Sequence, residues 1–349
     1  MKRLAFALLA LLFVVFFAGL APAAESEEET TPQQKSLEQV ETVVYGSPGS
    51  GGMFIRLARA ERDLFGMELP GSLTERQQAL LNFVEEGTPT QPSLIFKIGV
   101  AEWVTLNKVN PAIPLSDRVS NLEVNLEGEA QIGALSARLE RILTKLLPNG
   151  VYSAAVQIPS GTVFKAAFAK TLTVRTVKVG DVVELNVMDD FVQSGTLAIA
   201  RGDRVFAEIT KVKMPRSFGR TSEIGVDFKA IESLNGYHTP VTIGAQAKKA
   251  MEIDAGTAGA VGTSLVGAIL VGPLGLAGGF LVRGSDKQIP AGSTVYVETV
   301  ENTTVTGYPT AANTAPADSD TPAVNYSSPP PGESDFVPIN DGSSQGNTY

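Results

Sequence analysis

Residues 158–168 read IPSGTVFKAAF, and this stretch indicates how the C-terminal half of the chain folds. Ile158 is followed three residues later by Gly161, and then by alternating side chains of the kind that pack one face of a sheet. The same pattern recurs at 199–202 and at 289–292, each time before a run that favours a strand. A glycine at this point suits a tight turn with positive φ. We therefore expect an antiparallel β-barrel or sandwich over 151–308.

An uncharged apolar segment interrupts this pattern at 255–282, AGTAGAVGTSLVGAILVGPLGLAGGFLV. Glycines three and four residues apart let helices approach closely, as membrane helices do. We expect a helical insertion in one of three forms: a hairpin with arms at 256–271 and 274–282, a single span of about 26 residues kinked at Pro273, or a plug packed on the β-domain. The residues expected to pack against a membrane or a second copy are Gly256, Gly259, Gly262, Gly267, Gly272, Pro273, Gly275, Gly278 and Gly279.

The order of turns over 158–305 resembles the C-terminal β-barrel domain of the outer-membrane-complex scaffold protein of type IV secretion and conjugation systems. The resemblance rests on Pro159-Ser160-Gly161-Thr162, on Gly219-Arg220, on Asn235-Gly236 and on the run from Ile289 to Val297. In that family an apolar helical excursion before the last strand crosses the outer membrane as part of an oligomeric ring. The resemblance implies the same role for 255–282. This chain differs in having helical repeats where the family has an inner-membrane helix and a Pro-rich linker.

Residues 53–147 have a helical pattern with an internal repeat. The sequence LTER at 73–76 recurs as LSDR at 115–118 and as LSAR at 135–138, and an aliphatic residue follows each Arg by four positions. This spacing predicts a short helix, a turn and a second helix, repeated. Candidate N-caps of the second helices are Ser72 or Thr74, Ser116 and Ser136.

The repeats resemble the LFG…L-x-x-R…LE helical repeats of bacterial envelope proteins. Two interpretations of 53–147 stay open, an ordinary small helical bundle and a module that binds a peptide or protein partner. The single tryptophan, Trp103, lies in this region and is expected in a core or a groove.

Both ends of the chain have the composition of targeting and linker segments. Residues 1–23 combine Lys2 and Arg3 with an apolar core and a small-residue site, which predicts a signal peptide, the alternative being an uncleaved anchor. Residues 24–52 are acidic and then rich in Gly and Ser, which predicts a linker. Residues 309–349 lack a hydrophobic period and predict a disordered tail.

Composition limits the chemistry. The net charge of −9 argues against a nucleic-acid partner, and the absence of cysteine excludes disulfides and thiolate metal sites. His238 is the only histidine and lies in a turn pattern, and Asp189-Asp190 also has the pattern of a turn. We expect no catalytic residue, no metal, no cofactor and no small-molecule substrate.

A basic hairpin surrounds Met214-Pro215. It is either a solvated tip or a contact for an acidic partner or anionic lipid. The residues concerned are Lys211, Lys213, Arg216 and Arg220.

The sequence thus predicts an α+β multidomain protein, with an N-terminal module of short helical repeats and a C-terminal antiparallel β-barrel or sandwich that carries the glycine-rich insertion. It favours a non-enzymatic exported protein of the periplasm, outer membrane or cell surface, a structural or assembly component that is anchored or oligomerises at the outer membrane through 255–282. Its partners would be proteins or copies of itself. The alternative is a soluble periplasmic or surface binding module that uses its helical repeats.

Overall fold

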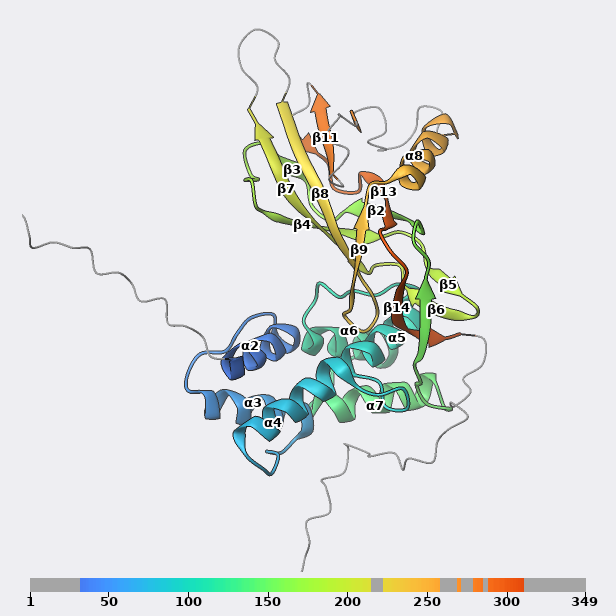
Figure 1. Ribbon diagram of the computed structural model, residues 1–349. Coiled ribbons are helices and arrows are strands. Elements are labelled where there is room, and N and C mark those ends of the chain that lie inside the picture. Colours follow the sequence, from blue (N-terminus) through green and yellow to red (C-terminus); the bar gives the residue numbers. More distant parts are fainter. Residues whose placement is uncertain (1–31, 215–221, 258–268, 271–278, 285–287, 311–349) are drawn as a thin grey trace, which may run out of the picture.

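The computed structural model describes residues 32–214, 222–257, 269–270, 279–284 and 288–310. Helices form the N-terminal part and strands the C-terminal part, so the α+β architecture is confirmed (Figure 1). The helices of the N-terminal part are α2 (Pro32–Tyr45), α3 (Met53–Phe65), α4 (Leu73–Leu81), the π-helix η1 (Asn82–Glu86), α5 (Leu94–Leu106), α6 (Leu115–Glu127) and α7 (Leu135–Leu146).

Helix α2 lies inside the segment expected to be a linker. Its residues Leu37, Val40 and Val44 are spaced along one helix face and are buried in the core of the helical part. The linker interpretation of 24–52 is therefore wrong for residues 32–45.

The helix boundaries follow local capping chemistry, although not always at the expected residue. Ser72 caps α4 and forms a capping box with Glu75, as the sequence suggested. Ser116 and Ser136 are not caps, because they lie inside α6 and α7, and the N-caps are Pro114 and Ala134. The repeat pattern thus located the helices and misplaced two of their first residues.

Six strands close into a barrel in which every neighbouring pair is antiparallel. In ring order they are β2 (Val163–Phe168), β4 (Val182–Val187), β7 (Arg204–Lys213), β8 (Ser222–Glu232), β9 (His238–Thr242) and β13 (Thr294–Thr299). Alternate residues point inward, as in β13, where Val295 and Val297 are completely buried. The turn glycines Gly161, Gly202 and Gly292 have φ of 77°, 94° and 80°, as predicted.

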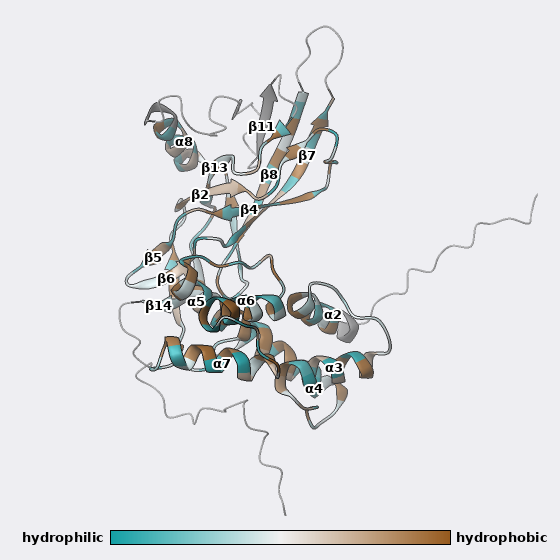
Figure 2. Cartoon of the chain, turned by 180° about the vertical axis from the view of Figure 1, so that it is seen from behind, coloured by the Kyte–Doolittle hydropathy of each residue, from teal (hydrophilic) through white to brown (hydrophobic). Residues whose placement is uncertain are grey.

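A second sheet forms half a barrel between the closed barrel and the helices. Its strand order is β1 (Ala154–Ile158), β14 (Thr303–Pro309), β6 (Thr196–Ile199) and β5 (Phe191–Gln193). A short pair, β3 (Leu172–Thr173) and β12 (Gln288–Ile289), lies beside the closed barrel. The core of the helical part continues into this region through Leu197, Leu234 and Tyr308. Figure 2 shows apolar and polar residues on opposite sides of helices such as α3 and α7.

The described ends of the glycine-rich segment contain one helix and two strands. Helix α8 (Ala245–Thr257) precedes it, β10 (Ile269–Leu270) lies within it, and β11 (Gly279–Gly284) pairs with β8. The expected helical arms are therefore wrong at two places: residues 269–270 of the arm 256–271 form β10, and residues 279–282 of the arm 274–282 form part of β11, because both pairs of strands continue the sheet. Residues 258–268 and 271–278, with most of the other predicted helical positions, lie outside the described residues.

Candidate functional site

Four helix–loop–helix units of the N-terminal part, α2–α3, α3–α4, α5–α6 and α6–α7, are each closed by a Glu–Arg pair. The Glu lies one turn before the end of the first helix, and the Arg lies in the first turn of the second. The Arg follows the Glu by 15 residues in three units and by 16 in the unit α5–α6. The four pairs are Glu41–Arg56, Glu61–Arg76, Glu102–Arg118 and Glu123–Arg138.

The repeat pattern in the sequence contains three of these arginines, Arg76, Arg118 and Arg138, but not their Glu partners. The signal that could have revealed them was a Glu 15 or 16 residues before each Arg, beyond the range of a single helix. The same signal would have shown that α2 and α3 form a further unit, because Glu41 and Arg56 keep the spacing although the residues between Gly46 and Met53 look like a flexible loop.

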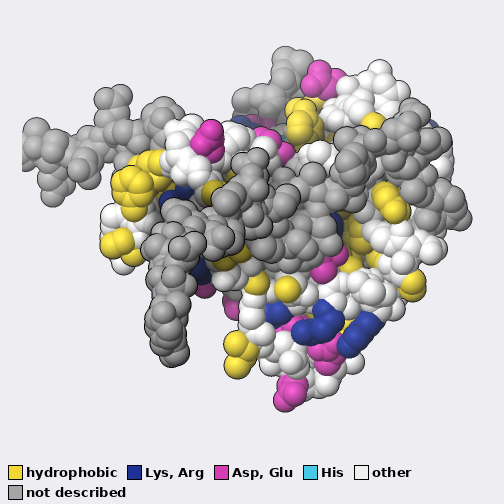
Figure 3. Space-filling view, turned by 90° about the horizontal axis from the view of Figure 1, so that it is seen from below, with side chains coloured by type: hydrophobic (Ala, Val, Ile, Leu, Met, Phe, Trp, Pro, Cys, Tyr) yellow, Lys and Arg dark blue, Asp and Glu magenta, His cyan; other side chains and the backbone are white. Residues whose placement is uncertain are grey.

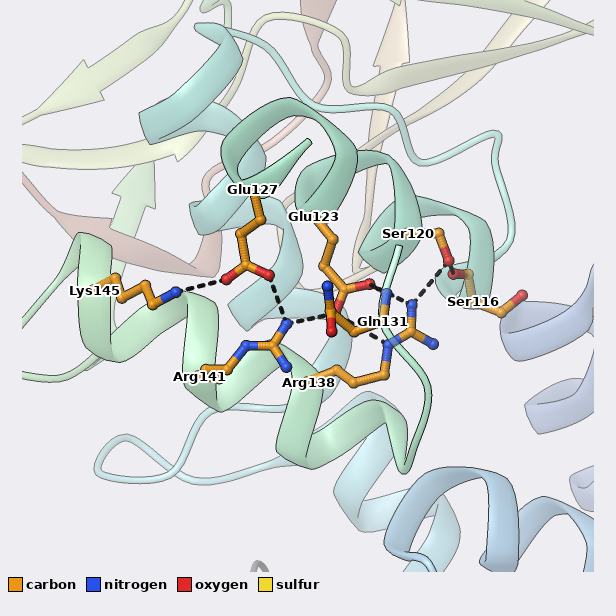
Figure 4. Close-up of polar contacts among 8 residues, drawn as sticks. All are labelled: Ser116, Ser120, Glu123, Glu127, Gln131, Arg138, Arg141 and Lys145. Atoms are coloured by element: carbon orange, nitrogen blue, oxygen red, sulfur yellow. Dashed lines mark hydrogen bonds and ion pairs between the residues drawn. The ribbon is translucent and has the colours of Figure 1, made fainter. Parts of the chain in front are cut away.

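The unit α6–α7 shows how one carboxylate holds a second helix and a loop (Figure 4). The Glu123 side chain is fully buried, with Arg138 donating to its two oxygens at 3.1 and 2.6 Å. The backbone N–H of Gln131 donates to the same carboxylate at 2.9 Å, and so does Arg141. Paired and hydrogen-bonded on all sides, the buried charge keeps the loop in one conformation.

The same loop contact recurs in other units. The N–H of Gly49 donates to Glu41 and that of Asn110 to Glu102, both at 2.8 Å and both eight residues after the Glu. The repeat is therefore a structural device, in which a buried carboxylate joins helix, loop and helix, and none of these groups is free to act on a substrate.

The stabilisation of the fold by the Glu123–Arg138 pair should depend on pH. Burial alone would raise the pKa of Glu123, but the hydrogen bonds from Arg138 and from the Gln131 N–H outweigh it and hold the pKa below its usual value of 4.5. A carboxylate with a lowered folded-state pKa stabilises the fold above pH 4.5, and the stabilisation is lost as the pH falls below that value.

We therefore expect the wild-type melting temperature to fall between about pH 6 and about pH 3, and the fall to be smaller in E123Q, which has no charge at this position to lose. Thermal unfolding followed by circular dichroism at both pH values measures the difference. Equal falls in the two proteins would contradict the assignment.

The loop of the unit α5–α6 joins the helical part to the β part. The N–H of Val109 donates to the Arg201 carbonyl at 2.8 Å, and Gly202 lies directly against the Val109 carbonyl. Trp103 donates its ring N–H to Asp190 at 2.9 Å, and Asp190 also accepts the Arg201 N–H. Asp189-Asp190 is thus a turn, as expected, but one that receives a side chain from the helical part.

The other end of the barrel holds the described flanks of the glycine-rich segment. The Ala247 N–H, in the first turn of α8, donates to Glu298 of β13 at 2.6 Å, and Asp254 near the end of α8 pairs with Lys165 of β2 at 3.1 Å. Ala247 and Met251 are buried against the barrel core. Helix α8 is therefore fixed to the barrel along its length.

Strand β8 holds the second flank. Its residues 222–227 pair with β11, whereas its residues 230–232 pair with β9, so one strand serves both the closed barrel and the extension. Two of the glycines predicted to pack in a membrane lie in described elements, Gly256 in α8 and Gly279 at the start of β11. The others, Gly259, Gly262, Gly267, Gly272, Pro273, Gly275 and Gly278, lie outside the described residues.

The basic residues predicted for a partner contact are partly used within the barrel wall. Lys211 and Lys213 of β7 both pair with Glu223 on β8, at 2.9 and 3.2 Å. A hydrogen bond from Lys211 and, to a smaller extent, one from Lys213 lower the pKa of Glu223 to about 2. This cross-strand pairing reduces their positive field. Arg216 and Arg220 lie outside the described residues.

His238 begins β9 and packs its ring beside Phe206. No group of three His, Cys, Asp or Glu side chains in the described ranges is placed to hold a metal ion. A cavity of about 510 Å³ lies between β4 and the 169–177 connection, and one of about 160 Å³ lies between Phe96 and β1. Among the described helices, none has both the length and the apolar character needed to cross a bilayer.

The chain was also compared with known proteins. No protein-family model matches it, and no curated protein does.

Proposed function

We propose that this chain is a non-enzymatic, exported component of a cell-envelope assembly. In this proposal the β-barrel presents the glycine-rich segment 255–282 to the outer membrane or to neighbouring copies, while the helical repeats bind a protein partner away from the membrane. The localisation follows from the signal-peptide pattern of residues 1–23.

The observation that carries the proposal is the position of the two flanks of the segment. Helix α8 and strand β11 are both attached to the barrel, at the end away from the helical part (Figure 1). The two described flanks of the segment are thus held at one end of the barrel, and β10, in the middle of the segment, pairs with β11. This is what a barrel that inserts a short element into a membrane, or into a ring of copies, requires.

Composition supports the same role. The segment has no charged residue, and Asp254 and Arg283 stand just outside its two ends. Its glycines suit close helix or strand packing between copies. The resemblance of 158–305 to the secretion-scaffold barrel, in which an excursion at the corresponding place enters the outer membrane, adds to the argument.

The helical end has the character of an aqueous surface. Seen from below, it shows apolar side chains in small separate groups among charged ones (Figure 3). Such a surface suits a contact with another protein better than burial in lipid. We assign partner binding to this end for that reason.

The test is to replace residues 258–278 with a short Gly-Ser linker that joins α8 to β11. In cells that express the full chain, we expect the wild-type protein in the outer-membrane fraction as a detergent-stable oligomer. The variant should move to the soluble fraction and lose the detergent-stable oligomer, because the apolar area that holds copies together in detergent is gone.

A variant that ends after Thr310 is the control, since it removes a polar stretch and should fractionate like the wild type. Circular dichroism checks that the barrel still folds in both variants. Unchanged fractionation and oligomer size on replacing 258–278 would refute the membrane role and favour the soluble binding module.

A further inference from the structure

The helical part consists of two equivalent halves. The first half, α2–α4, contains the pairs of Glu41 and Glu61, and the second half, α5–α7, contains those of Glu102 and Glu123. The spacing of each pair makes α2 equivalent to α5, α3 to α6 and α4 to α7. In both halves the first helix packs against the third.

The halves contact each other head to tail. The end of α2 lies on the start of α6, where a Cβ added to Gly46 would be 2.8 Å from a Pro114 ring carbon. The end of α3 lies on the start of α7, where the Ser136 hydroxyl donates to the Leu64 carbonyl at 2.7 Å. Helix ends of the first half thus cover helix starts of the second half.

By the same equivalence, the ends of α5 and α6 and the starts of α3 and α4 have no such contact within the helical part, and of the two ends that of α5 is held against the β part. Leu64, near the end of α3, is completely buried, whereas its equivalent Leu126, near the end of α6, is 41 % exposed. Ser136, in the first turn of α7, is 5 % exposed, whereas its equivalent Thr74 in α4 is exposed.

The start of α3, which is the other uncovered start, carries exposed apolar side chains. Phe54 and Ile55, in the first turn of α3, are 66 % and 70 % exposed. The equivalent residues at the start of α6, Ser116 and Asp117, are polar. Two large exposed apolar side chains at the uncovered face are a feature of binding surfaces.

We propose that two of these uncovered surfaces bind each other between copies of this chain. The end of α6, with Leu126 and Gly128, packs on the start of α4 in a second copy and repeats the contact that α3 makes with α7. The contact joins two different surfaces, so it extends copies head to tail into rings or chains. It does not depend on the glycine-rich segment or on a membrane.

The absence of cysteine permits a direct test by engineered disulfides. Thr74 and Leu126 are equivalent to Ser136 and Leu64, which are in contact, so T74C and L126C should come within disulfide range across the interface. Under mild oxidation the full-chain double variant T74C/L126C should form a ladder of covalent oligomers. Each single variant should not form the ladder, and an equal mixture of the two single variants should give dimers.

A second measurement does not depend on cross-linking. L126D should weaken self-association in analytical ultracentrifugation by about tenfold, whereas V300D, at a similarly exposed apolar residue of the barrel, should not. Both experiments are repeated in the variant that lacks 258–278, so that association through that segment is absent.

The outcomes decide the inference separately from the membrane role. No ladder, together with unchanged association of L126D, would overturn it even if the chain still fractionates with the membrane. Dimers of a single-cysteine variant would overturn the head-to-tail geometry in favour of a symmetric contact. A ladder in the variant without 258–278 would support the contact whatever the segment does.

Discussion

Replacing Glu123 with alanine should lower the free energy of unfolding of the protein by about 3–5 kcal/mol, the usual cost of breaking a buried ion pair. The substitution leaves the Arg138 guanidinium, 12 % exposed, and the Gln131 N–H without their acceptor. The loss should lie toward the lower end of that range, because Arg141, the third donor, is 38 % exposed and can turn to water.

Urea denaturation followed by circular dichroism at pH 7 measures this loss. Glu127→Ala is the matched control, since it removes a Glu from the same helix and the same network. Glu127 pairs with Arg141 and Lys145 at the rim, where its loss should change stability far less. Similar losses in the two variants would show that burial of Glu123 is not what makes its pair important.

Replacing Gly202 with alanine should detach the helical part from the β part. A Cβ at this position would lie 2.1 Å from the Val109 carbonyl oxygen, and backbone on both sides cannot give way as a side chain can. The φ of 94° adds strain for any residue with a side chain. Overpacking and backbone strain together should lower the free energy of unfolding by about 2–6 kcal/mol.

The only tryptophan of the chain reports on this junction. Trp103 donates to Asp190 across it, so opening should shift the fluorescence emission to longer wavelength before the barrel unfolds. Gly292→Ala is the control, because its φ is 80° but no atom lies within 4 Å of the added Cβ. It should cost only the backbone strain and leave the emission unchanged. An unchanged spectrum in Gly202→Ala would refute the proposed role of this contact.

Much of the fold could be predicted because its signals are local. Gly161, Gly202 and Gly292 each end a turn with positive φ, and an Ile-x-x-Gly pattern is enough to find such turns. The helices could be found from a Leu and an Arg at fixed spacing. The closure of the barrel is harder to predict from sequence. Strand β9 pairs with β8 just before it but also with β13, which begins more than 50 residues further along the chain.

The wrong predictions have a common physical cause: the local structure was determined by residues far away in the sequence. Residues 279–282 suit an apolar helix, yet β8 offers them an open edge with which to pair. Residues 46–52 suggested a linker, yet Glu41 fixes the loop through Gly49 and Arg56. The hydrogen bond of Val109 could not be predicted either, because the sequence of a loop does not indicate which carbonyl oxygen its N–H will bond to.

The extra residue in the loop between Glu102 and Arg118 has a consequence for how such a chain can change over evolution. Among the four Glu–Arg units, this one holds the contacts of Trp103 and Val109 with the β part, so it is not interchangeable with its three relatives. A deletion within α5–α6 would remove these contacts, whereas a change within α2–α4 would leave them in place. The distance from the barrel to the outermost helix is therefore set by the number of units ahead of α5, and a chain with more or fewer of them would have a longer or shorter reach.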